Sequence, residues 1–283
     1  MRLLLQAIHD IKEVLMRPRA VAYAIFVLGL SARISCSAQL SVGEILAKVS
    51  ETYRNLSSCR LVAESQKALA SNGQQQSEGG GTMVMNFHQT VTSLIDLAVS
   101  PGKIRLVVKD QTDQPGGGVA DKELLVVSDG QTTWGYTPRQ KQYTEETRTS
   151  SEAQGASQPT RSPEMNALRQ YWSLLVGRFR EVQQFSPTAT LGKEKRVKIG
   201  KEKVDCYVVK FQMEGITNEL WVDKGRFLVL HLAQTPPRPQ EGIAFQTAVT
   251  VNLTDVELNP QLPDELFKFT PPEQAMKVNS LKW

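Results

Sequence analysis

The chain has 283 residues and a formal charge of +4 at neutral pH, and most of this excess lies in residues 1–38. These residues hold five of the 33 basic and two of the 29 acidic side chains, so 28 basic and 27 acidic side chains remain. This balance excludes the broad basic surface that nucleic-acid binding needs, and we expect no nucleic-acid partner. The remaining chain is long enough for one large β domain with a hydrophobic core or for two small domains.

The first element is an uncharged, mostly apolar run at Ala20–Ala32, which follows Arg17 and Arg19 and precedes the small-residue exit Cys36–Ala38. This order of a basic flank, a short apolar run and small residues is typical of an export signal. A run of about thirteen residues, at about 1.5 Å per residue, is too short to cross a hydrocarbon core of about 30 Å. We therefore predict a signal peptide over residues 1–38, cleavage after Ala38 and a periplasmic mature protein over residues 39–283.

Two alternatives remain for this leader. The segment Met1–Arg19 is unusually long and contains Asp10 and Glu13, which leaves open an uncleaved anchor that tethers the protein to the inner membrane. Lipidation of Cys36 is the other alternative, but Arg33 stands where a lipoprotein signal usually has Leu.

The mature chain begins with a predicted amphipathic helix. Ser41 and Glu44 have the spacing of a capping box, in which two side chains satisfy free amide groups of the first turn. Apolar residues then recur at helical spacing at Val42, Ile45, Leu46, Val49, Tyr53 and Leu56. We expect this apolar face to pack on a hydrophobic surface.

Most of the chain that follows is predicted to form antiparallel strands. Apolar residues alternate with polar ones in five runs, which indicates burial of one face of a sheet. The turn signals Asp129-Gly130 and Lys224-Gly225 favour short connections between strands. The alternating sets are Met83, Met85 and Phe87; Ile104, Leu106 and Val108; Tyr207, Val209, Phe211 and Met213; Leu228, Leu230 and Leu232; and Val249, Val251 and Leu253.

A second helix is predicted to start at Ser162-Pro163-Glu164 and to end before Gly177. Its apolar stripe consists of Met165, Leu168, Tyr171, Trp172 and Leu175. With about ten strands and two helices, the expected fold class is α+β, mainly β, with a curved antiparallel sheet that forms an unclosed barrel under a helical lid. Residues 71–81 and 148–162 are poor in apolar side chains and are expected to be loops within a single domain.

Four segments in chain order resemble the family of periplasmic lipoprotein carriers of the LolA/LolB type. They are Tyr53–Leu56 (YRNL), Pro101–Arg105 (PGKIR), Leu124–Tyr136 (LLVVSDGQTTWGY) with Pro138, and Phe267–Pro272 (FKFTPP). The resemblance covers nearly the whole mature chain and implies a half-open β-barrel that holds acyl chains between its concave sheet and its helices. It also implies a non-enzymatic function, in which the opening of the lid releases the lipid or lipoprotein to a membrane receptor.

The apolar residues expected to line such a cavity come from both helices and from the strands. They are Leu46, Met85, Phe87, Leu106, Trp134, Tyr136, Leu168, Trp172, Leu230 and Val251. The alternative for each is a place in a filled core, because alternating Leu and Val usually indicate packing. Trp134 and Tyr136 lie on one face of their strand and could equally close the barrel wall.

One departure from the family pattern concerns the cargo. In carriers of lipoproteins an Arg stands immediately before the Pro of the PGKIR-like segment, where it helps to hold the lid shut, and here this position is Ser100. A hydroxyl group cannot replace the forked donors of a guanidinium. The resemblance therefore supports the fold and apolar binding more strongly than a lipoprotein shuttle.

Two cysteines, Cys59 and Cys206, remain after the expected cleavage. An even pair in an oxidising compartment could form a disulfide, and two buried free thiols are the alternative. Neither cysteine stands in a C-x-x-C motif, so we expect no catalytic use.

Motifs of enzyme chemistry are not found in the sequence. It lacks a nucleophile elbow, a phosphate-binding loop and an H-E-x-x-H motif, and the mature chain has only His88 and His231. We expect no cofactor and no metal.

Two functions remain, with a hydrolase as a distant third. The first is an exported carrier or sensor of lipid or lipoprotein acyl chains, and the second is a structural or interaction domain of the envelope with a filled core and no ligand.

Overall fold

The computed structural model describes residues 40–76, 82–113, 119–147, 162–237 and 246–283, without the side chains of residues 71–76 and 82–87. The predictions on the leader, including cleavage after Ala38, lie outside the described residues. Ser41–Trp283 form one compact unit. No helix within the described ranges has both the length and the apolar character needed to cross a membrane.

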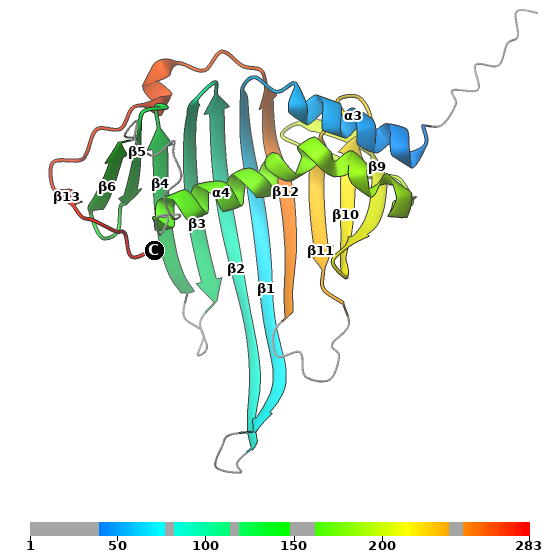
Figure 1. Ribbon diagram of the computed structural model, residues 1–283, viewed down its shortest axis with the longest axis horizontal. Helices are drawn as coiled ribbons and strands as arrows, with labels where there is room; N and C mark the ends of the chain where they lie inside the picture. Colours follow the sequence, from blue (N-terminus) through cyan, green and yellow to red (C-terminus); the bar gives the residue numbers. More distant parts are fainter. Residues whose placement is uncertain (1–39, 77–81, 114–118, 148–161, 238–245) are drawn as a thin grey trace, which may run out of the picture. The chain divides into compact units, whose positions relative to one another are not determined.

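A single curved sheet dominates the described residues (Figure 1). All strand pairs are antiparallel except β13 with β6, and the terminal strands β13 and β7 do not pair with each other, so the sheet is unclosed as expected. The thirteen strands exceed the expected ten because β7, β8 and β13 are too short to show a sequence pattern. In spatial order they are β13 (Met276–Lys277), β6 (Gln142–Thr147), β5 (Thr132–Thr137), β4 (Val119–Ser128), β3 (Lys103–Asp113), β2 (Thr82–Ser100), β1 (Cys59–Gln76), β12 (Gln246–Leu258), β11 (Val229–Thr235), β10 (Ile216–Asp223), β9 (Glu202–Met213) and β7 (Thr190–Leu191), while β8 (Lys195–Ile199) pairs with β9 outside this order.

Strands β1 and β2 extend into a region that was expected to be a loop. The pairing of β1 with β2 continues from Cys59 and Val99 to Gln76 and Thr82. Backbone hydrogen bonds between the strands therefore order residues 71–76, although this part of the sequence has few apolar side chains to indicate a strand.

The helices lie on one face of the sheet, which we call the inner face, and the opposite face is the outer face. Helix α4 (Pro163–Leu175) crosses the inner face from β4 toward β9, and α3 (Val42–Arg54) lies near β9–β11 (Figure 1). Two 3₁₀ helices complete the fold, η2 (Gly177–Thr188) and η3 (Asp264–Phe267).

The core lies between α4 and two rows of residues on the inner face of β1–β4. Neighbouring strands align these residues in register, and all of them are buried because alternate side chains of a strand point to the same face. The first row is Leu61, Leu97, Leu106 and Val126, and the second is Ala63, Ile95, Val108 and Leu124. Leu106 is thus a core residue beneath the helices.

Helix α3 begins as predicted. The Ser41 Oγ accepts a hydrogen bond from the Glu44 N–H at 3.3 Å, and the Glu44 carboxylate accepts one from the Ser41 N–H at 2.8 Å. The buried face of α3 includes Leu46, which packs in the core. The Tyr53 ring lies 5.0 Å from the Phe179 ring, and the Gln183 N–H donates to the Ser50 Oγ at 3.1 Å, so α3 is fixed against η2.

Helix α4 also begins as predicted, with Ser162 before it and Pro163 in its first turn. Its buried residues are Glu164, Ala167, Tyr171, Leu174 and Leu175. The expected stripe was partly wrong, because Met165, Leu168 and Trp172 are only half-buried. The buried face of α4 is rotated relative to the predicted stripe, because it includes the small Ala167 and the polar Glu164. These two residues lie where α4 approaches the sheet.

Candidate functional site

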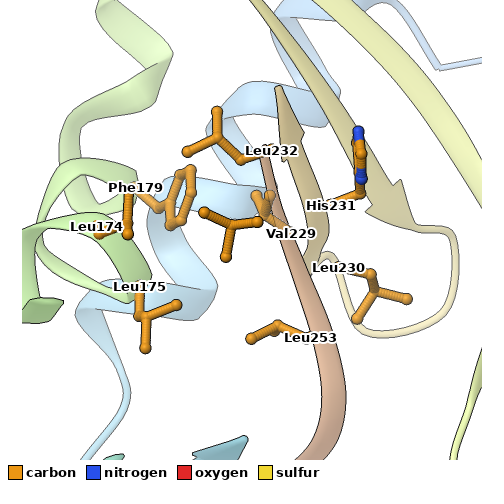
Figure 2. Close-up of a pocket in the computed structure, with 9 residues that line it drawn as sticks. Leu174, Leu175, Phe179, Val229, Leu230, His231, Leu232 and Leu253 are labelled. Atoms are coloured by element: carbon orange, nitrogen blue, oxygen red, sulfur yellow. The ribbon is translucent and has the colours of Figure 1, made fainter. Parts of the chain in front are cut away.

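A narrow apolar space lies between the helical segment and β11 and β12 (Figure 2). Leu174 and Leu175 at the end of α4 and Phe179 of η2 face Val229, Leu232 and Leu253 of the strands. The space has a volume of about 10 Å³. A volume of this size holds about one water molecule, so this part of the interior is a packed core.

A larger cavity adjoins it beneath η2, and we call it the η2 cavity. Its volume is about 180 Å³. Phe179 and Leu232 line both spaces, so the two are neighbours. The η2 cavity is lined by Ser173, Arg178, Phe179, Val182, Phe185, Phe211, Met213, Asn218, Leu220 and Leu232.

The walls of the η2 cavity are mostly aromatic and aliphatic. The rings of Phe185 and Phe211 stack at a centroid distance of 4.8 Å and an interplanar angle of 9°. The Phe179 ring also contacts the Tyr53 ring of α3. For comparison, an engineered apolar protein cavity of about 150 Å³ stays dry and binds benzene. The η2 cavity therefore has the size and the lining to hold a small hydrocarbon group.

Three polar residues line this cavity. Asn218 is buried, and its amide is satisfied because Nδ2 donates to the Ile216 carbonyl at 3.2 Å and Oδ1 accepts from Gln234 Nε2 at 2.9 Å. Ser173 and Arg178 are half-buried, so the cavity reaches solvent along them. Burial lowers the pKa of the Arg178 guanidinium below its ordinary value, but an arginine remains protonated.

The sequence analysis did not predict the cavity-lining residues of η2. Phe179, Val182 and Phe185 follow one another at a spacing of three residues. This spacing is that of a 3₁₀ helix, in which side chains at i and i+3 lie on the same face. The spacing of three residues was therefore the available signal for η2 in the sequence, but it extends over only one short segment between α4 and β7.

Two predicted residues border the narrow space, Leu230 and Val251. The register of β10 and β11 shifts here, so that Trp221 pairs with His231 and Val222 pairs with Val229, while Leu230 has no partner in β10. In Figure 2 the side chains of Leu230 and His231 extend to the opposite side from Leu175 and Phe179. The regular alternation expected for Leu228, Leu230 and Leu232 is therefore interrupted by a bulge.

Trp134 and Tyr136 lie on the outer face of the sheet, not in the space between sheet and helices. Gly135, between them, faces α4, because a Cβ on this residue would lie 3.0 Å from Glu164 Cβ. Both aromatic rings pack on Phe269 of the C-terminal segment, at centroid distances of 6.4 Å for Trp134 and 5.8 Å for Tyr136. Strand alternation showed that they share a face but not which face the helices would cover.

The remaining predicted residues do not meet at the η2 cavity. Leu46 belongs to the buried face of α3, Leu106 to the core beneath α4, and Leu168 and Trp172 to the half-buried flank of α4. The side chains of Met85 and Phe87 lie outside the described residues.

The outer face carries a groove of about 520 Å³, which we call the outer groove. Its apolar residues include Leu94, which is 53% exposed. Charged pairs border it, with 3.8 Å between Arg105 Nη1 and Asp96 Oδ2 and 3.4 Å between Lys109 Nζ and Glu123 Oε1. The apolar lining also contains Val62, Val107, Leu125, Tyr136 and Pro138.

Of the two alternatives for Cys59 and Cys206, the structure has the two buried free thiols and not the disulfide. Cys59 is in β1 and Cys206 is in β9, and β12, β11 and β10 lie between these strands. Four steps of about 4.8 Å between strands separate the residues by roughly 19 Å, whereas a disulfide needs Cα atoms about 4.4–6.8 Å apart. Burial raises the pKa of each thiol to about 11.

Several solved structures are similar to this chain at low identity. An uncharacterised conserved protein from Thermus thermophilus is 11% identical with a TM-score of 0.38, over 83% of this chain and 96% of that one. MucB in its complex with MucA from Pseudomonas aeruginosa is 13% identical with a TM-score of 0.34, over 83% of this chain and 63% of that one. A β-barrel-like protein of the domain of unknown function DUF1849 from Brucella abortus is 9% identical with a TM-score of 0.22, over 71% and 99%.

These structural likenesses are too weak to support an inference about function. None of the three descriptions names a lipoprotein carrier, so the resemblance to that family stays a prediction. No curated protein matches the chain. Residues 184–281, less than half of the chain, match the family described as predicted periplasmic protein (DUF2092), and the protein is periplasmic, as the leader predicts.

Proposed function

We propose that the protein is a non-enzymatic carrier or sensor that binds acyl chains of a lipid or lipoprotein in the η2 cavity. The observation that carries this proposal is the cavity itself, with a volume of about 180 Å³ and aromatic and aliphatic walls. Removal of hydrocarbon surface from water contributes about 25 cal/mol per Å² and needs no bond-making step. The volume suits the end of one chain, and a longer chain requires η2 to move away from the sheet.

Because η2 covers the cavity, its contacts with α3 must break when a long chain enters. The η2 helix follows α4 after Val176 and is held to α3 by the Tyr53–Phe179 contact and by the bond between Gln183 N–H and Ser50 Oγ. Phe179 separates the η2 cavity from the narrow space under Leu175. A rotation of its ring would join the two spaces into a longer channel for hydrocarbon.

Filling the cavity tests this proposal. Ser173 lines it from α4, so Ser173→Phe places a ring in the empty volume without removing a core side chain. Binding of a fluorescent acyl-chain probe is measured for wild type, for Ser173→Phe and for the matched control Gln170→Phe on the exposed side of α4. We expect at least about a tenfold loss of affinity for Ser173→Phe alone, equivalent to about 1.4 kcal/mol. Equal binding by all three proteins, or no binding by wild type, contradicts the proposal.

A second candidate is an interaction domain of the envelope that binds a protein partner on the outer face. The observation that favours it is the outer groove. The side chain of Leu94 is 53% exposed there, and charged residues border the groove. Apolar patches rimmed by polar residues are typical of protein interaction sites. A photoreactive residue at position 94 should then crosslink one envelope protein in living cells, whereas the same residue at the exposed Gln170 of α4, on the inner side of the sheet, should not. Identical crosslinking patterns from both positions would rule against this candidate.

A further inference from the structure

Arg178 is a feature of the η2 cavity that hydrocarbon binding alone does not require. It is the second residue of η2 and lines a cavity whose other walls are mostly apolar. Its side chain is half-buried, and burial lowers the pKa of its guanidinium. Because an arginine keeps its proton, a positive charge stands permanently in the cavity wall.

No counter-charge accompanies Arg178 within the described part of the chain. The cavity lining contains no Asp or Glu, and Arg178 forms no ion pair or hydrogen bond with another described residue. The amide of Asn218 is already bound to Ile216 and Gln234. A partly desolvated guanidinium without such partners is stabilised strongly by an anion that reaches it.

Other arginines of the chain are used differently. Arg226 donates from Nε to Asp223 at 2.6 Å, and Arg196 donates from Nε to Asp205 at 2.6 Å. Arg180, two residues after Arg178, places its guanidinium over the Trp172 ring at 5.3 Å. The Nε of Arg180 is also buried without a hydrogen-bond partner among the described residues, but of these four arginines only Arg178 lines the η2 cavity.

We propose that the η2 cavity binds an anionic amphiphile, with the hydrocarbon end among Phe179, Phe185 and Phe211 and the anionic group on Arg178. This inference rests on the proposed binding of acyl chains and adds the chemistry of the head group. The forked donors of a guanidinium match two oxygens of a carboxylate or a phosphate. The cavity volume of about 180 Å³ favours a single-chain ligand, such as a fatty acid or a lysophospholipid.

The test compares three ligands with the same chain: palmitic acid, its neutral methyl ester and palmitoyl lysophosphatidic acid. Their affinities for the mature protein over residues 39–283 are measured by displacement of a neutral fluorescent probe. The variants are Arg178→Gln, Arg178→Lys and, as a matched control, Arg180→Gln. We expect wild type and Arg180→Gln to prefer at least one of the anions over the ester by about tenfold or more. Arg178→Gln should lose this preference while it keeps its affinity for the ester, and Arg178→Lys should retain part of it.

The two anions distinguish the source of the head group. Preference for the fatty acid indicates a carboxylate, and preference for the lysophospholipid indicates a phosphate, and either supports the proposal. Removal of an unpaired charge should leave the melting temperature of Arg178→Gln unchanged or raised, so a loss of affinity cannot come from unfolding. Equal affinities of wild type for acid, phosphate and ester overturn the role of Arg178 but leave acyl-chain binding intact. Absence of binding for every ligand overturns both proposals.

Discussion

Gly135 lies where the first turn of α4 meets strand β5. A Cβ at this position would lie 2.9 Å from Leu281 Cδ1, 2.9 Å from Thr144 Oγ1 and 3.0 Å from Glu164 Cβ. Thr144 Oγ1 also donates a hydrogen bond to the buried Glu164 carboxylate. The absence of a side chain at residue 135 therefore lets the helix approach the sheet.

We predict that Gly135→Ala lowers the free energy of unfolding by about 1–3 kcal/mol, because the added methyl group forces neighbouring atoms apart. Urea denaturation measures this loss. Gly43→Ala is the matched control, since the nearest atom to its Cβ would be 3.9 Å away and the residue is helical. Its stability should be unchanged or raised by up to about 1 kcal/mol. An equal effect of both substitutions would contradict the role of Gly135.

At the scale of elements, α3 and α4 both follow a serine but use it differently. Ser41 forms a complete capping box with Glu44, whereas Ser162 forms no side-chain cap bond and its Oγ is buried without a partner among the described residues. Pro163 fixes the start of α4 instead, and Glu164 points to Thr144.

Ser41→Ala should therefore lower the free energy of unfolding by about 1 kcal/mol, within the usual range of about 0.5–2 kcal/mol for a lost helix cap. Ser162→Ala should change it by less than about 0.5 kcal/mol, because no hydrogen bond is lost. Both values come from denaturant titrations of the two variants. A loss for Ser162→Ala as large as that for Ser41→Ala would show that the cap of α4 is also used.

The sequence predicts the elements better than it predicts which of their faces meet. Both helix starts could be read because capping residues and Pro163 act locally. The bulge at Leu230 and the outer position of Trp134 and Tyr136 could not, since alternation shows which residues share a face but not which face is covered. The short η2 gave only the spacing of Phe179, Val182 and Phe185 as a signal.

At the scale of the whole molecule, the order of strands decides which distant residues meet. Sequence position alone does not show that three strands lie between Cys59 and Cys206, so it left both the disulfide and the free thiols open. Both thiols are buried, and burial raises the pKa of each to about 11. At neutral pH almost no thiolate is present, and the thiolate is the reactive form.

We accordingly predict that Cys59 and Cys206 remain unmodified when the folded protein is exposed to iodoacetamide at neutral pH. Both should be alkylated after unfolding in urea without reductant. Mass spectrometry of the two cysteine-containing peptides measures this. A peptide pair that is released only after reduction would show that the disulfide forms after all.

The described residues combine a well-packed inner face under α4 with an unfilled apolar volume under η2. The narrow space of about 10 Å³ is a core, as the filled-core alternative expects, whereas the adjoining cavity of about 180 Å³ is large enough for hydrocarbon. The central claim is that this cavity carries an acyl chain in the periplasm. A ligand that co-purifies with the native protein tests this more directly than the binding of an added probe.

Mass spectrometry of lipid extracts from the protein purified out of its own envelope tests this claim. We predict that wild type and Gln170→Phe yield an acyl-chain ligand in near-stoichiometric amount, and that Ser173→Phe yields about a tenth of it or less. Wild-type protein without any acyl-chain compound, or the same amount from Ser173→Phe, would contradict the account.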